Sequence, residues 1–247
     1  MSGSDVLSEI FSRGAVRHGD EWIELHSNVS EDEGRYLQEL VTAADATRTL
    51  EVGMAYGIST VFILEALAKR TAAPSHIAID PFQNSDWKGI GLANVDRAGY
   101  RSLLEFHEAP SEFVLPGLAS AGHTIDFALI DGWHSFDQAL VEFFYVSRML
   151  RVGGIVAFDD ADWPGLTKLM RFILTLPGYA LYGGQGRTLA PSTVGRFRQR
   201  LADTGVGHRL LRPEFRRRNW ELGIHHRCVA FQKLNASALD MRFFRDF

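Results

Sequence analysis

The stretch Glu51-Val52-Gly53-Met54-Ala55-Tyr56-Gly57-Ile58-Ser59-Thr60 joins residues 47–53, which include Leu50 and Val52, to a largely apolar run at residues 58–69. The first segment is predicted to be a buried strand and the second a helix. The two glycines between them allow the backbone to turn tightly and to approach a ligand closely. A strand, a glycine loop and a helix in this order predict one unit of a parallel α/β sheet. The alternative is a tight turn that binds nothing.

The same alternation of short apolar runs and amphipathic stretches continues from about residue 30 to residue 175. It is typical of parallel strands joined by helices. Further strands are expected at residues 76–80, 103–107, 125–130 and 153–158, with a closing pair at 179–182 and 227–234. We therefore expect an α/β fold with a mostly parallel sheet.

Polar residues mark where three of the helices begin. Ser30 and Ser135 each precede a Glu or Gln by three residues, which is the pattern of a capping box. Asp162-Trp163-Pro164 predicts a third helix start, with Asp162 as the N-cap and Pro164 in the first turn.

Length and composition indicate one globular domain spanning residues 1–247, in which 46% of residues are hydrophobic and 23% charged. The net charge of −4 argues against a general nucleic-acid-binding protein. Cys228 is the single cysteine, which excludes an intrachain disulfide and a cysteine-based metal site. Residues 1–16 lack a secretory signal, and no apolar run approaches the roughly 20 residues that cross a bilayer. We expect a cytoplasmic protein with no membrane partner.

Two segments depart from the alternating pattern. An N-terminal helical segment is expected over about residues 1–45. Residues 183–224 lack clear periodicity and hold nine arginines against three acidic residues, in a chain that is acidic overall. We interpret residues 183–224 as an insertion that forms a solvated or subunit-contacting face. A surface for an anionic polymer is the alternative.

The glycine loop differs from a dinucleotide fingerprint, which has three glycines in the spacing G-x-G-x-x-G. An acid at Glu51 would repel a pyrophosphate, but it could accept a hydrogen bond from a cationic amino group. Ser59, in the first turn of the helix, is placed to hydrogen-bond a carboxylate. These features favour a cofactor that carries an amino acid.

Asp80 ends the second predicted strand, in the sequence Ala78-Ile79-Asp80-Pro81. An acid at this point of a nucleotide-binding fold can accept the hydroxyls of a ribose. Because Asp-Pro is also a common turn starter, capping the following turn is the alternative role.

These motifs resemble class I methyltransferases that use S-adenosylmethionine (SAM), and within them the branch of macrocin-type sugar O-methyltransferases and the cephalosporin-modifying methyltransferase. The resemblance spans about residues 24–175. Besides the glycine loop, it rests on the motifs at residues 26–30, 80–83, 130–135 and 153–160. It implies a Rossmann-like, doubly wound sheet of seven strands in the order 3-2-1-4-5-7-6. Strand 7 is antiparallel, and helices cover both faces.

The resemblance also implies which residues hold SAM. The methionine part is assigned to the glycine loop, the ribose to Asp80, and the adenine to the turn at residues 108–111. The cofactor-binding set is Glu51, Gly53, Tyr56, Gly57, Ser59, Asp80, Ser111 and Asp131.

Three carboxylates follow two strands that are neighbours in such sheets. Asp131 follows the fourth strand, and Asp159 and Asp160 follow the fifth. Like charges that are packed together need protonation or a cation to neutralise them, and a hard divalent ion such as Mg²⁺ is the simplest one. Related enzymes bind a divalent ion at these positions. The alternative is that these acids cap turns or bond to the backbone.

His134 lies just before the Ser135 cap, at the mouth of the same expected cleft. As a general base it could take the proton from a substrate hydroxyl, and Asp131 is the other candidate for that role. A structural role for His134 is the alternative, and His26 is a second candidate near the substrate. Trp87, Trp133 and Trp163 could wall an apolar or sugar-binding pocket, or simply pack.

Taken together, the sequence predicts a SAM-dependent methyltransferase that methylates a small-molecule hydroxyl with the help of a divalent metal, and that forms a homo-oligomer. The hydroxyl could belong to a sugar, a polyketide or another secondary metabolite. The alternatives are a metal-independent N- or O-methyltransferase, a nicotinamide-dependent oxidoreductase and a non-catalytic binding protein with the same fold.

Overall fold

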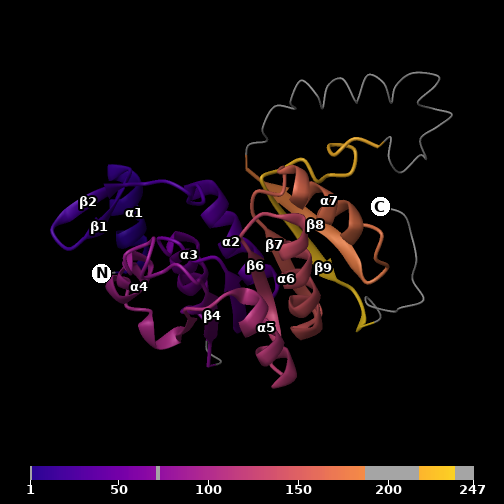
Figure 1. Ribbon diagram of the computed structural model, residues 1–247, viewed down its shortest axis with the longest axis horizontal. Coiled ribbons are helices and arrows are strands. Elements are labelled where there is room, and N and C mark those ends of the chain that lie inside the picture. Colours follow the sequence, from indigo (N-terminus) through magenta and orange to yellow (C-terminus); the bar gives the residue numbers. More distant parts are fainter. Residues whose placement is uncertain (1, 71–72, 187–216, 237–247) are drawn as a thin grey trace.

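The centre of the protein is a seven-stranded sheet in the order β5-β4-β3-β6-β7-β9-β8 (Figure 1). It is seen in a computed structural model that describes residues 2–70, 73–186 and 217–236. The strands are β3 (Arg48–Val52), β4 (Ser75–Ile79), β5 (Leu104–His107), β6 (Ile125–Ile130), β7 (Leu150–Phe158), β8 (Tyr179–Gln185) and β9 (Cys228–Lys233). β9 runs antiparallel to β7 and β8, and the pairs from β5 to β7 are parallel. The predicted order and the antiparallel last strand are confirmed.

Helices cover both faces of this sheet, as a doubly wound fold requires. α1 (Gly3–Arg13), α2 (Glu31–Ala43), α3 (Ile58–Leu67) and α4 (Ile90–Arg97) bury their apolar side chains against one face. α5 (Ser111–Ser120), α6 (Phe136–Met149) and α7 (Pro164–Ile173) pack on the other. All six residues of β6 are buried, because this strand lies at the middle of the sheet with helices on both sides. No helix in the described part of the chain is both long and apolar enough to cross a membrane.

The helix starts follow the prediction in two cases out of three. Ser30 and Ser135 are the N-caps of α2 and α6, and their side chains accept hydrogen bonds from the backbone N–H groups of Glu33 and Gln138. The N-cap of α7 is Trp163 and not Asp162, so that prediction is wrong by one residue. Pro164 is the first helical residue, and proline forces the residue before it into the extended conformation that an N-cap needs.

The N-terminal segment is not wholly helical as expected. Between α1 and α2 it contains an antiparallel hairpin of β1 (Ala15–His18) and β2 (Glu21–Glu24). Four-residue strands carry too little periodicity to be recognised in the sequence. Most of the predicted insertion at residues 183–224, namely residues 187–216, lies outside the described residues.

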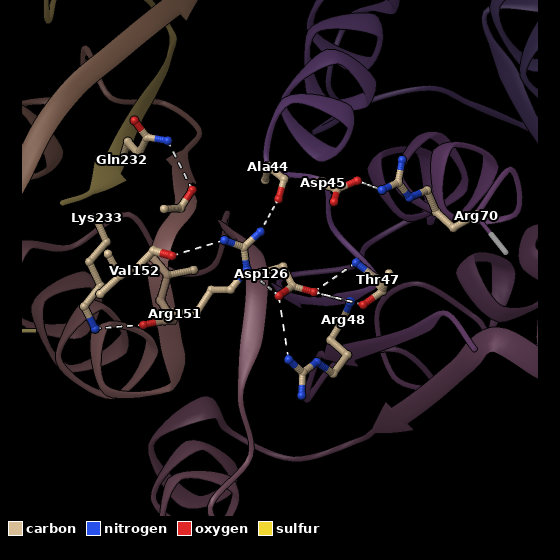
Figure 2. Close-up of polar contacts among 12 residues, drawn as sticks. Ala44, Asp45, Thr47, Arg48, Arg70, Asp126, Arg151, Val152, Gln232 and Lys233 are labelled. Atoms are coloured by element: carbon tan, nitrogen blue, oxygen red, sulfur yellow. Dashed lines mark hydrogen bonds and ion pairs between the residues drawn. The ribbon is translucent and has the colours of Figure 1, made fainter. Parts of the chain in front are cut away.

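The buried carboxylate of Asp126 is the centre of an ion-pair cluster at the edge of the sheet opposite the carboxyl ends of the parallel strands (Figure 2). Asp126, near the start of β6, is 4% exposed. Its Oδ2 accepts hydrogen bonds from the backbone N–H groups of Thr47 and Arg48 at 2.9 and 2.8 Å. Its Oδ1 accepts one from Arg151 Nε at 2.8 Å. Burial opposes ionisation, but these hydrogen bonds outweigh it and lower the pKa of Asp126. The carboxylate thus joins β3, β6 and β7.

Replacing Asp126 with alanine is expected to lower the free energy of unfolding by about 1–3 kcal/mol, because it leaves two backbone N–H groups and the partly exposed Arg151 without their partner. Urea denaturation measures the change. A matched control is Asp96→Ala, which breaks an exposed ion pair with Arg101 and should cost about 1 kcal/mol or less. Equal effects of the two variants would show that the cluster contributes no more than a surface pair.

Candidate functional site

A cleft of about 1010 Å³ opens beyond the carboxyl ends of β3, β4, β6 and β7. In open parallel sheets, ligands bind at this edge. Its lining includes residues 52–53, 79–82, 131–134 and 159–160, each at or just after the end of a strand. The volume lies at the top of the range of about 300–1000 Å³ for small-molecule sites, so the cleft can hold a cofactor and an acceptor together.

The glycine loop enters this cleft through Gly53 and Ala55. Gly53 has a φ of 87°, and a Cβ atom added to it would lie 2.0 Å from the backbone oxygen of Asp131. Gly57 has a φ of 72°, and a Cβ there would lie 2.8 Å from the backbone oxygen of Gly91. The left-handed conformation and the close approach of a second backbone both require glycine at these two positions.

Asp80 holds the glycine loop in place. Its Oδ2 accepts hydrogen bonds from the N–H groups of Met54 and Ala55, and its Oδ1 accepts one from the N–H of Phe82. The capping role is therefore present in the structure. A carboxylate has about four lone-pair sites, so Asp80, which lines the cleft, can still accept a hydrogen bond from a ribose hydroxyl.

Four of the predicted cofactor residues do not line the cleft: Glu51, Tyr56, Gly57 and Ser59. Glu51 is fully buried, and its Oε2 accepts a hydrogen bond from Thr60 at 2.5 Å. The Tyr56 hydroxyl lies 2.7 Å from His26 Nε2. Contact of these four residues with a cofactor stays a prediction.

Aromatic side chains surround the mouth of the cleft. The Trp87 ring lies 5.0 Å from the Tyr56 ring and 5.7 Å from the His26 ring, measured between centroids. Trp163 lies 5.4 Å from His134. Trp133, which is 69% exposed, lies 6.1 Å from Phe82. All three predicted tryptophans line the cleft and offer apolar surface to an acceptor.

The structure brings His134 close to two of the three predicted carboxylates, Asp131 and Asp160. His134 has a φ of 54°, and its Nε2 lies 3.7 Å from Asp131 Oδ1 and 3.6 Å from Asp160 Oδ2. Burial lowers the pKa of His134, against the opposing attraction of Asp160. The imidazole is therefore neutral near pH 7 and able to accept a proton.

The carboxylates themselves are buried close to one another. Burial, followed by the charges of Asp159, Glu51 and Asp160, raises the pKa of Asp131 well above its usual range. Burial and then the charge of Asp160 raise the pKa of Asp159 to about 7. Asp131, Asp159 and Asp160 thus form the acidic rim of the cleft. They are costly to ionise, and a cation beside them stabilises their charged forms.

Arg227 supplies such a cation, and sequence analysis missed it. Its Nε lies 3.1 Å from Asp160 Oδ1, 3.8 Å from Asp159 Oδ1 and 3.7 Å from Glu33 Oε1. The sequence suggested Arg227 only as the first residue of a closing strand. Its position beside the acids follows from the antiparallel register, which the sequence does not contain. Phe158 pairs with Val229, so the residue two before Val229 comes beside the acids that follow β7.

The rim does not fit the predicted divalent ion as it is arranged. Its oxygen donors suit a hard cation chemically. However, no three His, Cys, Asp or Glu side chains of the described residues gather as a metal-binding group, and the Arg227 guanidinium contacts both Asp159 and Asp160. A divalent ion would therefore have to compete with Arg227 for these two acids.

Glu142 is a second residue that the sequence did not reveal. It lies on α6, lines the cleft and is 2% exposed. Its Oε1 accepts a hydrogen bond from Ser111 Oγ at 2.8 Å. Burial raises the pKa of Glu142 to about 7 despite this bond. Ser111, the predicted adenine contact, is thus held by a buried acid.

Glu142→Gln is expected to remove a pH-dependent loss of stability. Because the folded pKa lies above the usual 4.5, ionising Glu142 opposes folding. As the pH rises from about 4.5 through 7, the wild-type protein should lose up to about 3 kcal/mol more unfolding free energy than the variant, in which Asp131 and Asp159 still titrate. Urea denaturation at about pH 5 and about pH 8 tests this, with the exposed Glu112→Gln as the control. Parallel pH profiles for wild type and Glu142→Gln would contradict the expectation.

The chain is similar in sequence to known methyltransferases. Residues 50–161 match the model of a family described as a methyltransferase domain. The chain is 30% identical over 148 residues to a flavonoid 3',5'-methyltransferase of Vitis vinifera, and 28% identical over 146 residues to a caffeoyl-CoA O-methyltransferase of Petunia hybrida. These matches cover 56% and 55% of this chain. The chain spans about half the length of the relatives, 57% and 54%.

Solved O-methyltransferase structures share the fold. The Streptomyces achromogenes enzyme TomG, involved in tomaymycin synthesis and solved with SAM, matches with a TM-score of 0.63 and 16% identity, over 94% of this chain and 89% of its own. An O-methyltransferase from Bacillus cereus, solved with S-adenosylhomocysteine (SAH), matches with a TM-score of 0.58 and 18% identity, over 72% of this chain and 81% of its own. The sheet therefore has the Rossmann-like fold of these O-methyltransferases, and residues 50–161 are similar in sequence to a methyltransferase domain.

Proposed function

We propose that the protein transfers a methyl group from SAM to a hydroxyl of a small molecule. The observation that carries this proposal is the position of His134, with Nε2 between Asp131 and Asp160 at the rim of a cleft large enough for a cofactor and an acceptor. The methyltransferase domain and the O-methyltransferases among its relatives support the same reaction.

In the proposed reaction, SAM when bound supplies a methyl group on a positively charged sulfur. His134 would accept the proton of the acceptor hydroxyl at Nε2 while that oxygen takes the methyl group, and the departing sulfur would keep the electron pair of the broken bond. Asp160, whose Oδ2 lies 3.6 Å from Nε2, would favour the protonated imidazole, and Asp131 lies 3.7 Å from the same nitrogen. Asp131 is the alternative base. The loop at Gly53 and the carboxylate of Asp80 position the cofactor, and alignment of the reactants supplies much of the acceleration.

The acceptor is proposed to be a sugar, a polyketide or another secondary metabolite. Trp133, Trp163 and Phe82 at the cleft mouth offer the apolar surface that such molecules need. Metal assistance, predicted from the sequence, is the less favoured form of the reaction because Arg227 already contacts two of the three acids. We also expect a homo-oligomer.

Calorimetric titration with SAH and SAM tests the proposed cofactor. We expect micromolar dissociation constants with or without added Mg²⁺, because of the eight residues assigned to the cofactor only Asp131 is also a predicted metal ligand. NAD⁺ serves as the control ligand and should not bind, since the loop lacks the third glycine of a dinucleotide site. Failure of both SAH and SAM to bind would favour a non-catalytic binding protein with the same fold. Methyl transfer from labelled SAM to a panel of hydroxyl and amine acceptors then separates O- from N-methylation.

A further inference from the structure

The position of Arg227 has a consequence for the chemistry of the cleft. We propose that Arg227 is a built-in cation that neutralises the acidic rim in place of a divalent metal, so that the reaction is metal-independent. This inference rests on the proposed function, because it takes the rim to be the reaction centre.

The charges at the rim require such a cation. Asp131, Asp159, Asp160 and Glu33 have side chains that are 21%, 5%, 12% and 4% exposed. Water screens buried carboxylates poorly, so they repel one another strongly. Among the described residues that line the cleft, Arg227 is the one lysine or arginine. Its guanidinium is the group that can offset this repulsion without an ion from solution.

The backbone fixes Arg227 at this place. The N–H of Ala161 donates a hydrogen bond to the Arg227 backbone oxygen at 2.7 Å. This bond lies next to the pair Phe158–Val229, where the pairing of β7 with β9 ends. This bond joins the residue after the acids to the residue before β9. Arg227 therefore reaches Asp160 as a result of strand register.

A residue outside the reaction centre anchors the guanidinium from the other side. Glu33 Oε1 lies 3.7 Å from Arg227 Nε, while Glu33 Oε2 accepts hydrogen bonds from the N–H and Oγ of Ser30, both at 2.9 Å. The capping box of α2 thus orients Glu33 toward the rim. Because Arg227 pairs with Glu33 as well as with Asp159 and Asp160, moving the guanidinium away would break more than one ion pair.

A divalent ion at the rim would have to share the same acids with Arg227. Two cations at the same carboxylates repel each other at short range. The Arg227 side chain is 38% exposed, so solvent and ligands can approach it from the cleft. In the bound state, its charge is placed to stabilise negative charge that develops on the acceptor oxygen.

Binding of Mn²⁺ alone, followed by electron paramagnetic resonance of the free ion, tests this role. The full chain should show no site tighter than about 1 mM. Arg227→Gln should gain one site that binds Mn²⁺ about tenfold more tightly or better, because the competing charge is gone. Arg227→Lys, which keeps the charge, should behave like wild type. Arg35→Gln is the matched control, because it removes an exposed arginine that pairs with Glu31 on α2.

A micromolar Mn²⁺ site in the wild-type protein that Asp160→Asn abolishes would overturn the proposal, and this measurement needs no Arg227 variant. A folded Arg227→Gln protein that gains no site would overturn it too. SAH titration in parallel keeps the two ideas separate. Loss of SAH binding would count against the methyltransferase proposal, whereas a metal site in the wild type would count only against the role of Arg227.

Discussion

His134→Asn is expected to lower kcat by about two to four orders of magnitude while SAH binding stays within about threefold of wild type. The imidazole is the neutral base nearest to Asp131 and Asp160, and its removal leaves the acceptor proton without a partner. Asparagine is the appropriate replacement because His134 has a φ of 54°, a conformation that asparagine tolerates better than most residues. The variant therefore tests chemistry with little change in backbone strain.

Single-turnover transfer from labelled SAM to the first acceptor found in the panel measures the effect. His123→Gln is the matched control, because His123 is exposed in the turn before β6, at the opposite end of this strand from Asp131. Full activity of His134→Asn combined with loss of activity in Asp131→Asn would move the base to Asp131. Full activity of both variants would remove the rim from the mechanism.

The sheet and most of its helices could be predicted because each element carries its own pattern. Residues 125–130 are apolar except for Asp126, and Ser30 and Ser135 carry the capping pattern ahead of their helices. Such signals lie within a few residues of the feature that they predict. The N-cap of α7 was misassigned because aspartate is a better cap than Trp163 locally, and the constraint from Pro164 outweighs that preference.

Part of the site depends on contacts between distant segments, which local patterns do not contain. The acids after β6 and β7 could be placed together because neighbouring parallel strands end at one edge. Arg227 could not, because its approach to Asp160 depends on the register of a strand that follows a long segment without periodicity. Glu33 was visible only as a capping residue, although it also faces Arg227. The sequence therefore pointed to a metal as the cation beside these acids and gave no sign of Arg227.

Gly53→Ala is expected to weaken SAH binding by about a hundredfold or more and to destabilise the fold by more than the usual cost of a left-handed alanine, about 1–2 kcal/mol. The added Cβ would lie 2.0 Å from the backbone oxygen of Asp131, so either the glycine loop or the end of β6 must move. Both segments line the cleft, and a shift of either displaces the groups that are proposed to hold the cofactor and the base.

Alanine substitutions at two other glycines distinguish the steric clash of the added Cβ from the backbone strain of a positive φ. Gly122 has a φ of 78° with nothing within 4 Å of an added Cβ, so Gly122→Ala carries the strain alone and should leave SAH binding intact. Gly117 lies within α5 with open space around it, and Gly117→Ala should raise stability by about 0.5–1 kcal/mol. SAH calorimetry and urea denaturation of the three variants measure both effects. If Gly53→Ala bound SAH like Gly122→Ala, close approach at the glycine loop would play no part in cofactor binding, and the assignment of SAM to this loop would fail.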